Sequence, residues 1–240
     1  MAANKQLGLK DAKTMWDDSK LMKKLVPIID NHKIVAEKTA LLVLDMNYVC
    51  AHRDYGIGPR LNLIGLSDDF YNRIDNGVIP NIQKLLSYFR KNNLSVFYTT
   101  MGCEQEDMSD LPETWRKIYT MVGYNTSRPG TKEFEIRDEV KPMKDETVLL
   151  KKTCGAFSSC DMHGTLQKMG ADTLVIVGVE TDACIYATAI EANDKGYKVI
   201  VLDDASTTVT VTGHKMMLHT YGRLFFFNVK TTDEVIEELS

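Results

Sequence analysis

Short apolar runs alternate along the chain with longer segments of mixed polarity. The clearest run, 173–177, is rich in β-branched side chains and is followed at once by Gly178, as is typical of a strand covered on both faces. Similar runs predict strands over 40–44, 95–100, 147–150, 198–202 and 224–227. Strands that alternate with helices predict an α/β fold, a three-layer αβα arrangement with a six-stranded, mostly parallel sheet and helices on both faces.

The segments between these runs carry the signals of helices. Apolar side chains recur at helical spacing over 72–92, and shorter helices are predicted over 161–168, 213–221 and 232–239. Another helix is expected to begin near Cys184 and to stop at Lys195 and Gly196, a cation followed by a glycine. Cys184 would then lie in the first helical turn, where the positive end of the helix dipole favours a thiolate.

The chain has 240 residues, which suits one α/β domain. We place this domain at 39–240 and interpret the polar, Lys-rich stretch 1–38 as an N-terminal arm. Glycines and a proline mark 48–70 as an excursion that folds over a site. Residues 101–143 lack a strong period and predict a long loop with short helical pieces that borders the pocket.

Charge and hydropathy exclude several classes of partner. The formal net charge is -4 at pH 7, and no block of Lys and Arg is longer than a pair, so no nucleic-acid partner is expected. The first residues lack an apolar signal segment, and no run approaches the roughly 18 apolar residues that cross a bilayer. A cytoplasmic protein without a membrane partner is expected.

Cysteines and glycines indicate neither a metal nor a cofactor. The five cysteines are scattered, odd in number and without a CxxC pair, which argues against a disulfide framework or a zinc site. Gly56 and Gly58 do not begin a dinucleotide-binding fingerprint, because Leu61 stands where the third glycine belongs. We therefore expect a protein that binds a small molecule without metal or cofactor.

Three reactive residues follow predicted strands: Asp45, Lys151 and Cys184. In an open α/β sheet, ligands bind outside the carboxyl ends of the strands. A carboxylate, an ammonium group and a thiol are sufficient for acyl transfer through a covalent thioester, with the acid as proton carrier. Each residue alone has a commoner role: Cys184 as a small buried hydrophobe, Asp45 as a cap and Lys151 as a solvated strand end.

Several motifs occur together along the chain: Leu44-Asp45-Met46-Asn47, Lys151 with Ala156-Phe157 downstream, Gly178-Val179-Glu180-Thr181-Asp182-Ala183-Cys184, Ala192 with Gly196-Tyr197, and Asp204-Ala205. In residue type and spacing, from about residue 39 to the C-terminus, this pattern resembles the isochorismatase-like cysteine hydrolases. That family includes nicotinamidases, N-carbamoylsarcosine amidases, ureidoacrylate amidohydrolases and biuret hydrolases. The resemblance implies an isochorismatase-like fold and a homo-oligomer, either a dimer or a tetramer, to which the N-terminal arm is a candidate contributor.

The resemblance also implies roles for individual residues. It implies a catalytic triad of Asp45, Lys151 and Cys184, because the family's spacing before the Ala-Phe step selects Lys151 rather than Lys152. It further implies a cis peptide bond between Val179 and Glu180. We expect the backbone N–H groups of Glu180 and Cys184 to form the oxyanion hole.

Two departures from family patterns narrow the expected activity. Nicotinamidases have a metal-binding Asp-x-His and a further His after the second strand, whereas this chain reads Thr-Thr-Met-Gly-Cys-Glu-Gln over 99–105. True isochorismatases lack the cysteine at Cys184. A metal-independent amidohydrolase of small carboxamide, carbamoyl or ureido substrates is therefore expected; the alternatives are a nicotinamidase-type pyridine carboxamide hydrolase and a catalytically weak binding or scaffold protein.

Candidate pocket residues come from the same motifs and loops. Asn47 follows the predicted acid and is expected to orient Asp45 or to bind the substrate amide. Trp115 and Phe157 are candidate substrate-binding side chains, with core packing as the alternative. Cys154 is expected to lie close enough to the site to be oxidised together with Cys184.

Overall fold

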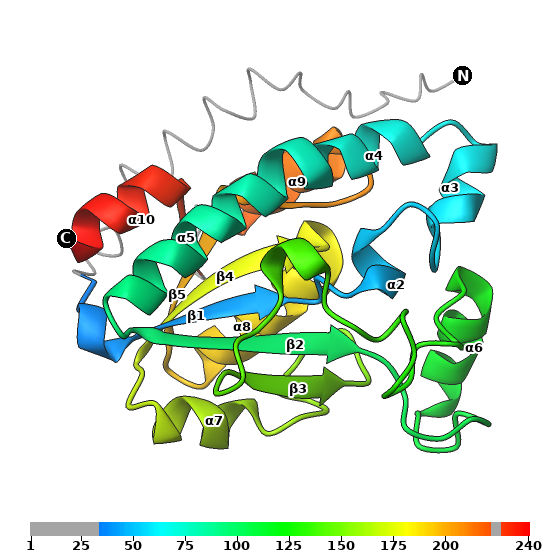
Figure 1. The fold of residues 1–240 in the computed structure, drawn as a ribbon, viewed down its shortest axis with the longest axis horizontal. Coiled ribbons are helices and arrows are strands. Elements are labelled where there is room, and N and C mark those ends of the chain that lie inside the picture. Colours follow the sequence, from blue (N-terminus) through cyan, green and yellow to red (C-terminus); the bar gives the residue numbers. More distant parts are fainter. Residues whose placement is uncertain (1–33, 222–226) are drawn as a thin grey trace, which may run out of the picture.

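The computed structural model describes residues 34–221 and 227–240. Its centre is a six-stranded sheet in which every pairing is parallel. The strands are β1 (Thr39–Leu44), β2 (Ser95–Met101), β3 (Thr147–Lys151), β4 (Thr173–Val179), β5 (Lys198–Thr207) and β6 (Asn228–Lys230). Helices cover both faces of the sheet (Figure 1), so the predicted three-layer α/β fold is confirmed, with a sheet that is parallel throughout.

The two ends of the chain fall partly outside the described residues. Residues 1–33 of the predicted N-terminal arm lie there, as does most of the strand predicted over 224–227. Phe227 is buried but belongs to no strand, and β6 begins at Asn228. The prediction followed the run of phenylalanines and so did not include the mixed Asn-Val-Lys segment that forms β6.

The helical elements connect the strands as the alternating pattern predicts. They are η1 (Ala36–Lys38), α2 (Tyr48–Ala51), α3 (Gly58–Leu63), α4 (Ser67–Arg73), η2 (Ile74–Val78), α5 (Ile79–Lys91), α6 (Glu113–Val122), η3 (Asp138–Val140), α7 (Met162–Lys168), η4 (Thr181–Ile185), α8 (Tyr186–Asp194), α9 (Val211–Thr220) and α10 (Thr232–Leu239). The helix predicted over 72–92 begins earlier, because α4 continues through the π turn η2 into α5. The two predicted loops contain α2 and α3 in one case and α6 and η3 in the other.

Several helices begin at side-chain caps that the sequence supplies. The capping residues are Asp161 for α7, Thr210 for α9 and Thr231 for α10, and each accepts a backbone N–H from the first turn. The Glu234 carboxylate accepts a hydrogen bond from the backbone N–H of Thr231, which completes a capping box. Such caps satisfy N–H groups that have no partner inside the helix.

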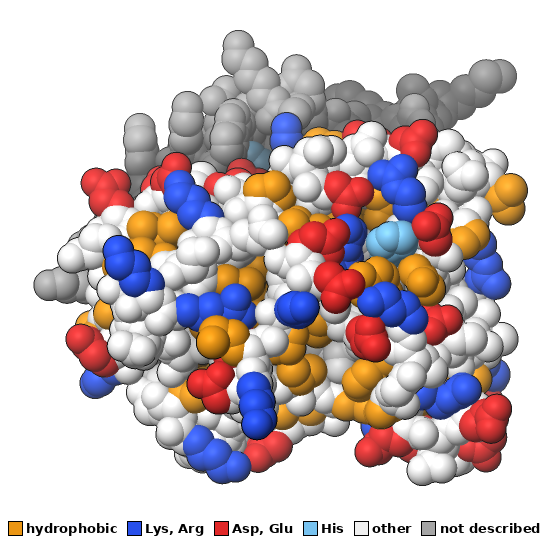
Figure 2. Space-filling model, in the orientation of Figure 1, with side chains coloured by type: hydrophobic (Ala, Val, Ile, Leu, Met, Phe, Trp, Pro, Cys, Tyr) orange, Lys and Arg blue, Asp and Glu red, His pale blue; other side chains and the backbone are white. Residues whose placement is uncertain are grey.

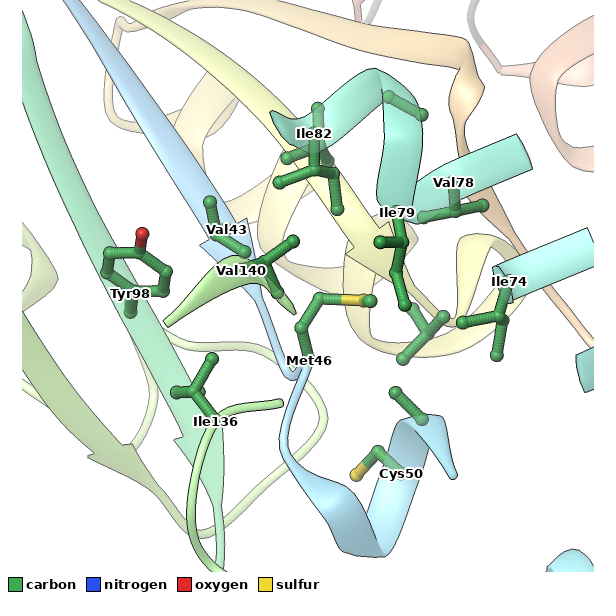
Figure 3. Close-up of a cluster of buried hydrophobic side chains, with 14 of the residues drawn as sticks. Val43, Met46, Cys50, Ile74, Val78, Ile79, Ile82, Tyr98, Ile136 and Val140 are labelled. Carbon is green, nitrogen blue, oxygen red and sulfur yellow. The ribbon is translucent and has the colours of Figure 1, made fainter. Parts of the chain in front are cut away.

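Two buried clusters separate the layers. Leu41 and Val43 of β1 face a cluster shared with α4, α5 and α10, while Ala40, Leu42 and Leu44 face a cluster shared with α7, α8 and α9. In Figure 3, Val43, Met46 and side chains from η2 and α5 point into the first cluster. Every residue of β1 and β4 is buried, which explains why these strands are continuously apolar rather than alternating.

The strand order places a topological switch point at the centre of the sheet. The order is β3-β2-β1-β4-β5-β6, so the chain builds outward from β1 to β3 and then crosses back to add β4 on the other side of β1. Ligands of open α/β sheets bind at such a switch point, beyond the carboxyl ends of the two central strands. Asp45 follows β1 directly, and the 180–184 turn follows β4.

Gly178 allows β1 and β4 to approach each other closely near this switch point. Its φ is 116°, and a Cβ built there would lie 2.1 Å from the carbonyl oxygen of Leu44. We expect Gly178→Ala to lower the free energy of unfolding by about 1–3 kcal/mol, through backbone strain and that collision. Urea titration monitored by circular dichroism measures the change.

The matched control is Gly77→Ala in η2. A Cβ at Gly77 meets nothing within 4 Å, and alanine restricts the unfolded chain more than glycine does. Gly77→Ala should therefore leave stability unchanged or raise it by up to about 1 kcal/mol. Equal unfolding free energies for the two variants would contradict this account of Gly178.

Candidate active site

Asp45 is held rigidly at the end of β1. Its side chain is fully buried, and its φ is 52°. Thr99 of β2 binds it twice: the Thr99 hydroxyl donates to Asp45 Oδ1 at 2.8 Å, and the Asp45 N–H donates to the Thr99 carbonyl at 3.2 Å. Sequence analysis assigned no role to Thr99, although it pairs with Leu44 in the parallel register and so lies at the same edge of the sheet.

Lys151 forms the centre of the site from the last position of β3. Its side chain is fully buried, and its Nζ lies 2.8 Å from Asp45 Oδ2 and 3.3 Å from Cys184 Sγ. The ammonium also donates to the carbonyl oxygens of Thr153 at 2.7 Å and Cys154 at 3.1 Å. The structure therefore brings the three predicted residues together around one cation.

The charge state of Lys151 follows from these contacts. Burial lowers the pKa of Lys151, but the Asp45 carboxylate and Cys184 oppose burial and raise that pKa above its ordinary value overall. Lys152, the neighbour in sequence, points away from the site and pairs with Glu104 and Asp110. Successive side chains of an extended chain point to opposite sides. The Lys151 ammonium is therefore buried at the site, whereas that of Lys152 is partly exposed.

Cys184 lies half-buried in the π turn η4, immediately before α8. The hydrogen bond with the Cys154 thiol and burial raise the pKa of Cys184, and Lys151 only partly offsets them. The expectation that a first-turn helix dipole would favour the thiolate is therefore wrong: Cys184 precedes the α-helix, and the Cys154 hydrogen bond, followed by burial, raises its pKa. A raised pKa favours the thiol, which needs a base to become a nucleophile.

The turn that presents Cys184 is fixed at both ends. The peptide bond between Val179 and Glu180 is cis, where the resemblance placed a cis bond. The carbonyl of Glu180 accepts from the N–H groups of Ala183 and Ile185, both at 3.1 Å. The Thr181 hydroxyl lies 2.8 Å from His214 Nδ1. These contacts hold the backbone N–H groups of the turn in a defined arrangement.

The three candidate substrate-binding residues occupy different positions. Asn47 is buried and donates its amide N–H groups to the carbonyl oxygens of Met101 at 2.9 Å and Glu133 at 3.3 Å. Trp115 is half-buried on α6 and packs against the first cluster. Phe157 packs against the second cluster, on the opposite face of the sheet.

Two tyrosines from the long loop also approach the triad. The Tyr119 hydroxyl donates to the Gly102 carbonyl at 3.2 Å and lies 3.5 Å from the Lys151 carbonyl. Burial raises the pKa of Tyr124, as do the nearby Cys50 thiol and Glu180 carboxyl. The sequence leaves Tyr124 open between pocket wall and core and assigns no role to Tyr119; the aromatic residues gathered over 115–124 were the signal available.

Three further observations concern possible metal ligands, membrane-spanning helices and surface charge. Within 34–221 and 227–240, no three His, Cys, Asp or Glu side chains lie close enough together to hold a metal ion. The same part of the chain contains no helix both long and apolar enough to span a membrane. Figure 2 shows acidic and basic side chains interspersed across the face that it presents.

Comparisons with known proteins agree with this geometry. The Isochorismatase domain model matches residues 39–234. An uncharacterized isochorismatase family protein of Bacillus subtilis, YddQ, is 31% identical over 173 residues, which is 72% of this chain and 79% of YddQ. Ureidoacrylate amidohydrolase RutB of Acinetobacter baylyi is 26% identical over 185 residues, or 72% of each chain.

Solved structures show the same fold. A cysteine hydrolase from Pseudomonas syringae pv. phaseolicola superposes with a TM-score of 0.70 at 22% identity, covering 87% of this chain and 95% of that one. The family model spans most of the sequence, and it includes all three residues gathered around the Lys151 ammonium. The chain therefore belongs to the isochorismatase-like cysteine hydrolase family and is a hydrolase.

Proposed function

We propose that this protein is a metal-independent amidohydrolase that cleaves a C–N bond of a small carboxamide, carbamoyl or ureido substrate through a thioester on Cys184. The observation that carries the proposal is the Lys151 ammonium, which lies 2.8 Å from Asp45 and 3.3 Å from Cys184. A buried cation between a carboxylate and a thiol favours the anionic form of both. The relative named ureidoacrylate amidohydrolase supports the same reaction class.

In the first half of the reaction, Asp45 accepts the Cys184 proton and the thiolate attacks the carbonyl carbon. Lys151 stabilises the thiolate as it forms, which compensates for the raised pKa of the buried thiol. The backbone N–H groups of Glu180 and Cys184 would stabilise the tetrahedral oxyanion, as preorganised donors do in acyl transfer.

In the second half, Asp45 returns the proton to the leaving nitrogen. The C–N bond breaks, ammonia or an amine departs, and a thioester on Cys184 remains. Asp45 then deprotonates a water that attacks the thioester, and the released thiolate recovers its proton. The net reaction consumes one water and yields an acid, or a carbamate from a ureido substrate, together with the amine.

The test is a panel of carboxamides, N-carbamoyl amino acids and ureido compounds, assayed for ammonia or amine release. We expect turnover within this panel and, after rapid acid quench, an acyl adduct on the peptide that contains Cys184. Turnover that survives complete alkylation of Cys184 would refute the thioester route. Nicotinamide as the preferred substrate would favour the pyridine carboxamide hydrolase, and no turnover with slow, uniform labelling of all five cysteines would favour a binding or scaffold protein.

A further inference from the structure

Glu180 places a second carboxyl group beside the triad. It follows the cis peptide bond directly, four residues before Cys184, and its side chain is half-buried. Burial raises the pKa of Glu180 to about 7, and the Asp182 and Asp45 carboxylates act in the same direction. The mechanism uses only the backbone N–H of Glu180, so the role of its side chain is unassigned.

The Glu180 carboxyl has no partner in the described structure. Within 34–221 and 227–240, no group donates a hydrogen bond to it or forms an ion pair with it. The Glu180 oxygens are not among the enclosed side-chain atoms that lack a partner, so solvent reaches them, and a carboxyl that no protein donor binds can accept hydrogen bonds from a ligand. Because its residue retains some exposure, a small molecule can reach it.

The surroundings of this carboxyl are rich in acceptors and hydroxyl groups. Glu180 lies within electrostatic range of Cys50, Tyr71 and Tyr124. The Tyr71 hydroxyl is fully buried, and within the described residues it has no hydrogen-bond partner. These side chains come from α2, α4 and the loop after α6, so the carboxyl faces that side of the site.

Asn47 contributes a second acceptor without a partner. Its two N–H contacts are both with carbonyl oxygens, which fixes the orientation of the amide. Its Oδ1 is buried and accepts no hydrogen bond from the described residues. Because that oxygen is enclosed and Lys151 is matched by Asp45, the half-buried Glu180 carboxyl is the acceptor that a substrate N–H group can reach.

We propose that the Glu180 carboxyl binds the part of the substrate beyond the scissile carbonyl, and selects amides that carry a neutral or cationic N–H group over amides that carry a carboxylate. This inference rests on the proposed function and names a substrate class for it. The relative RutB is named for ureidoacrylate, a substrate that carries a carboxylate. The preference proposed here is the opposite one, against a carboxylate on the substrate.

Three amides that share a two-methylene spacer test the preference: 3-aminopropanamide as the cation, succinamide as the neutral compound and succinamate as the anion. For the wild type above pH 7, we expect kcat/KM for the cation to exceed that for the anion by about tenfold or more. Glu180→Gln should lower this ratio by about tenfold while changing the rate with succinamide less. Glu113→Gln, an exposed substitution on α6, controls for net charge and should leave the ratio unchanged.

The pH dependence separates recognition from a structural defect. Glu180 is ionised above about pH 7, so the preference for 3-aminopropanamide over succinamide should be greatest there and decline as the pH falls through 7. The ammonium of the amide stays charged over this range, and Glu180→Gln should show no such decline. The groups that face the carboxyl are Asp45, Cys50, Tyr71, Tyr124, Cys154 and Asp182.

Isothermal titration calorimetry measures how tightly the three amides bind to Cys184→Ala protein, with and without Glu180→Gln. This measurement separates failure of this inference from failure of the proposed function. Charge-selective binding that Glu180→Gln removes, without turnover by the wild type, would support the inference and count against the amidohydrolase. Turnover with a ratio that Glu180→Gln leaves unchanged would overturn the inference alone. A wild type that prefers succinamate, or Cys184→Ala protein that binds none of the three amides, would also overturn it.

Discussion

Replacing Cys184 with alanine is expected to lower kcat/KM on any hydrolysed amide by on the order of 10⁴-fold or more. The substitution removes the sulfur that carries the proposed thioester and leaves Asp45 and Lys151 in place. Because Cys184 is half-buried and makes one contact with the ammonium, alanine should leave the fold intact. Steady-state ammonia release and the mass of the quenched protein measure the effect.

Cys160→Ala is the matched control for this experiment. Cys160 is also half-buried, but its thiol donates to the Ala156 carbonyl at 3.0 Å and not to the triad. We expect its loss to change kcat/KM by about twofold or less. A Cys184→Ala variant that retained even a tenth of wild-type activity would rule out the covalent mechanism.

Replacing Lys151 with methionine is expected to lower the free energy of unfolding by about 3–5 kcal/mol, because it leaves the buried Asp45 carboxylate without its counter-charge. Both side chains are completely inaccessible to solvent, and their charged atoms are 2.8 Å apart. Activity should fall as well, since the thiolate loses its stabilising cation. Urea unfolding and ammonia release measure the two effects on the same preparation.

A double variant distinguishes this explanation from a simple packing defect. Asp45→Asn combined with Lys151→Met removes both charges, so it should be more stable than Lys151→Met alone, yet equally inactive. Lys152→Met, which loses only partly exposed pairs with Glu104 and Asp110, should cost about 1 kcal/mol or less. If the double variant were less stable than Lys151→Met, the ion pair would not explain the loss.

Strand positions were predictable where a short apolar run begins abruptly after polar residues, including the run at the edge strand β3. The predicted starts of the segments at 95, 147, 173 and 198 coincide with those of β2, β3, β4 and β5. The end of β5 was missed by five residues, since the polar stretch 203–207 does not look like a strand. It continues the sheet beyond a shift in register, where Ser206 pairs with Gly178, and that pairing depends on β4 rather than on local sequence.

Helical periodicity was less informative around Cys184. The apolar spacing correctly indicated a helix after the turn, but it did not distinguish an α-helical first turn from the π turn η4 that carries the cysteine. The raised pKa of Cys184 has its largest cause in the Cys154 thiol, followed by burial. Cys154 is 30 residues away along the chain, so no local pattern could indicate the hydrogen bond between the two thiols.

The sequence by itself determined the fold class, the family resemblance and the identities of Asp45, Lys151 and Cys184, because each lies at or just beyond the end of a strand whose apolar pattern is local. The tertiary structure decided what those residues do to one another. β3 is separated from β1 by β2, so only the folded sheet brings the Lys151 ammonium to Asp45 and Cys184. It likewise left the Glu180 carboxyl without a donor, since burial and missing partners arise from elements distant in sequence.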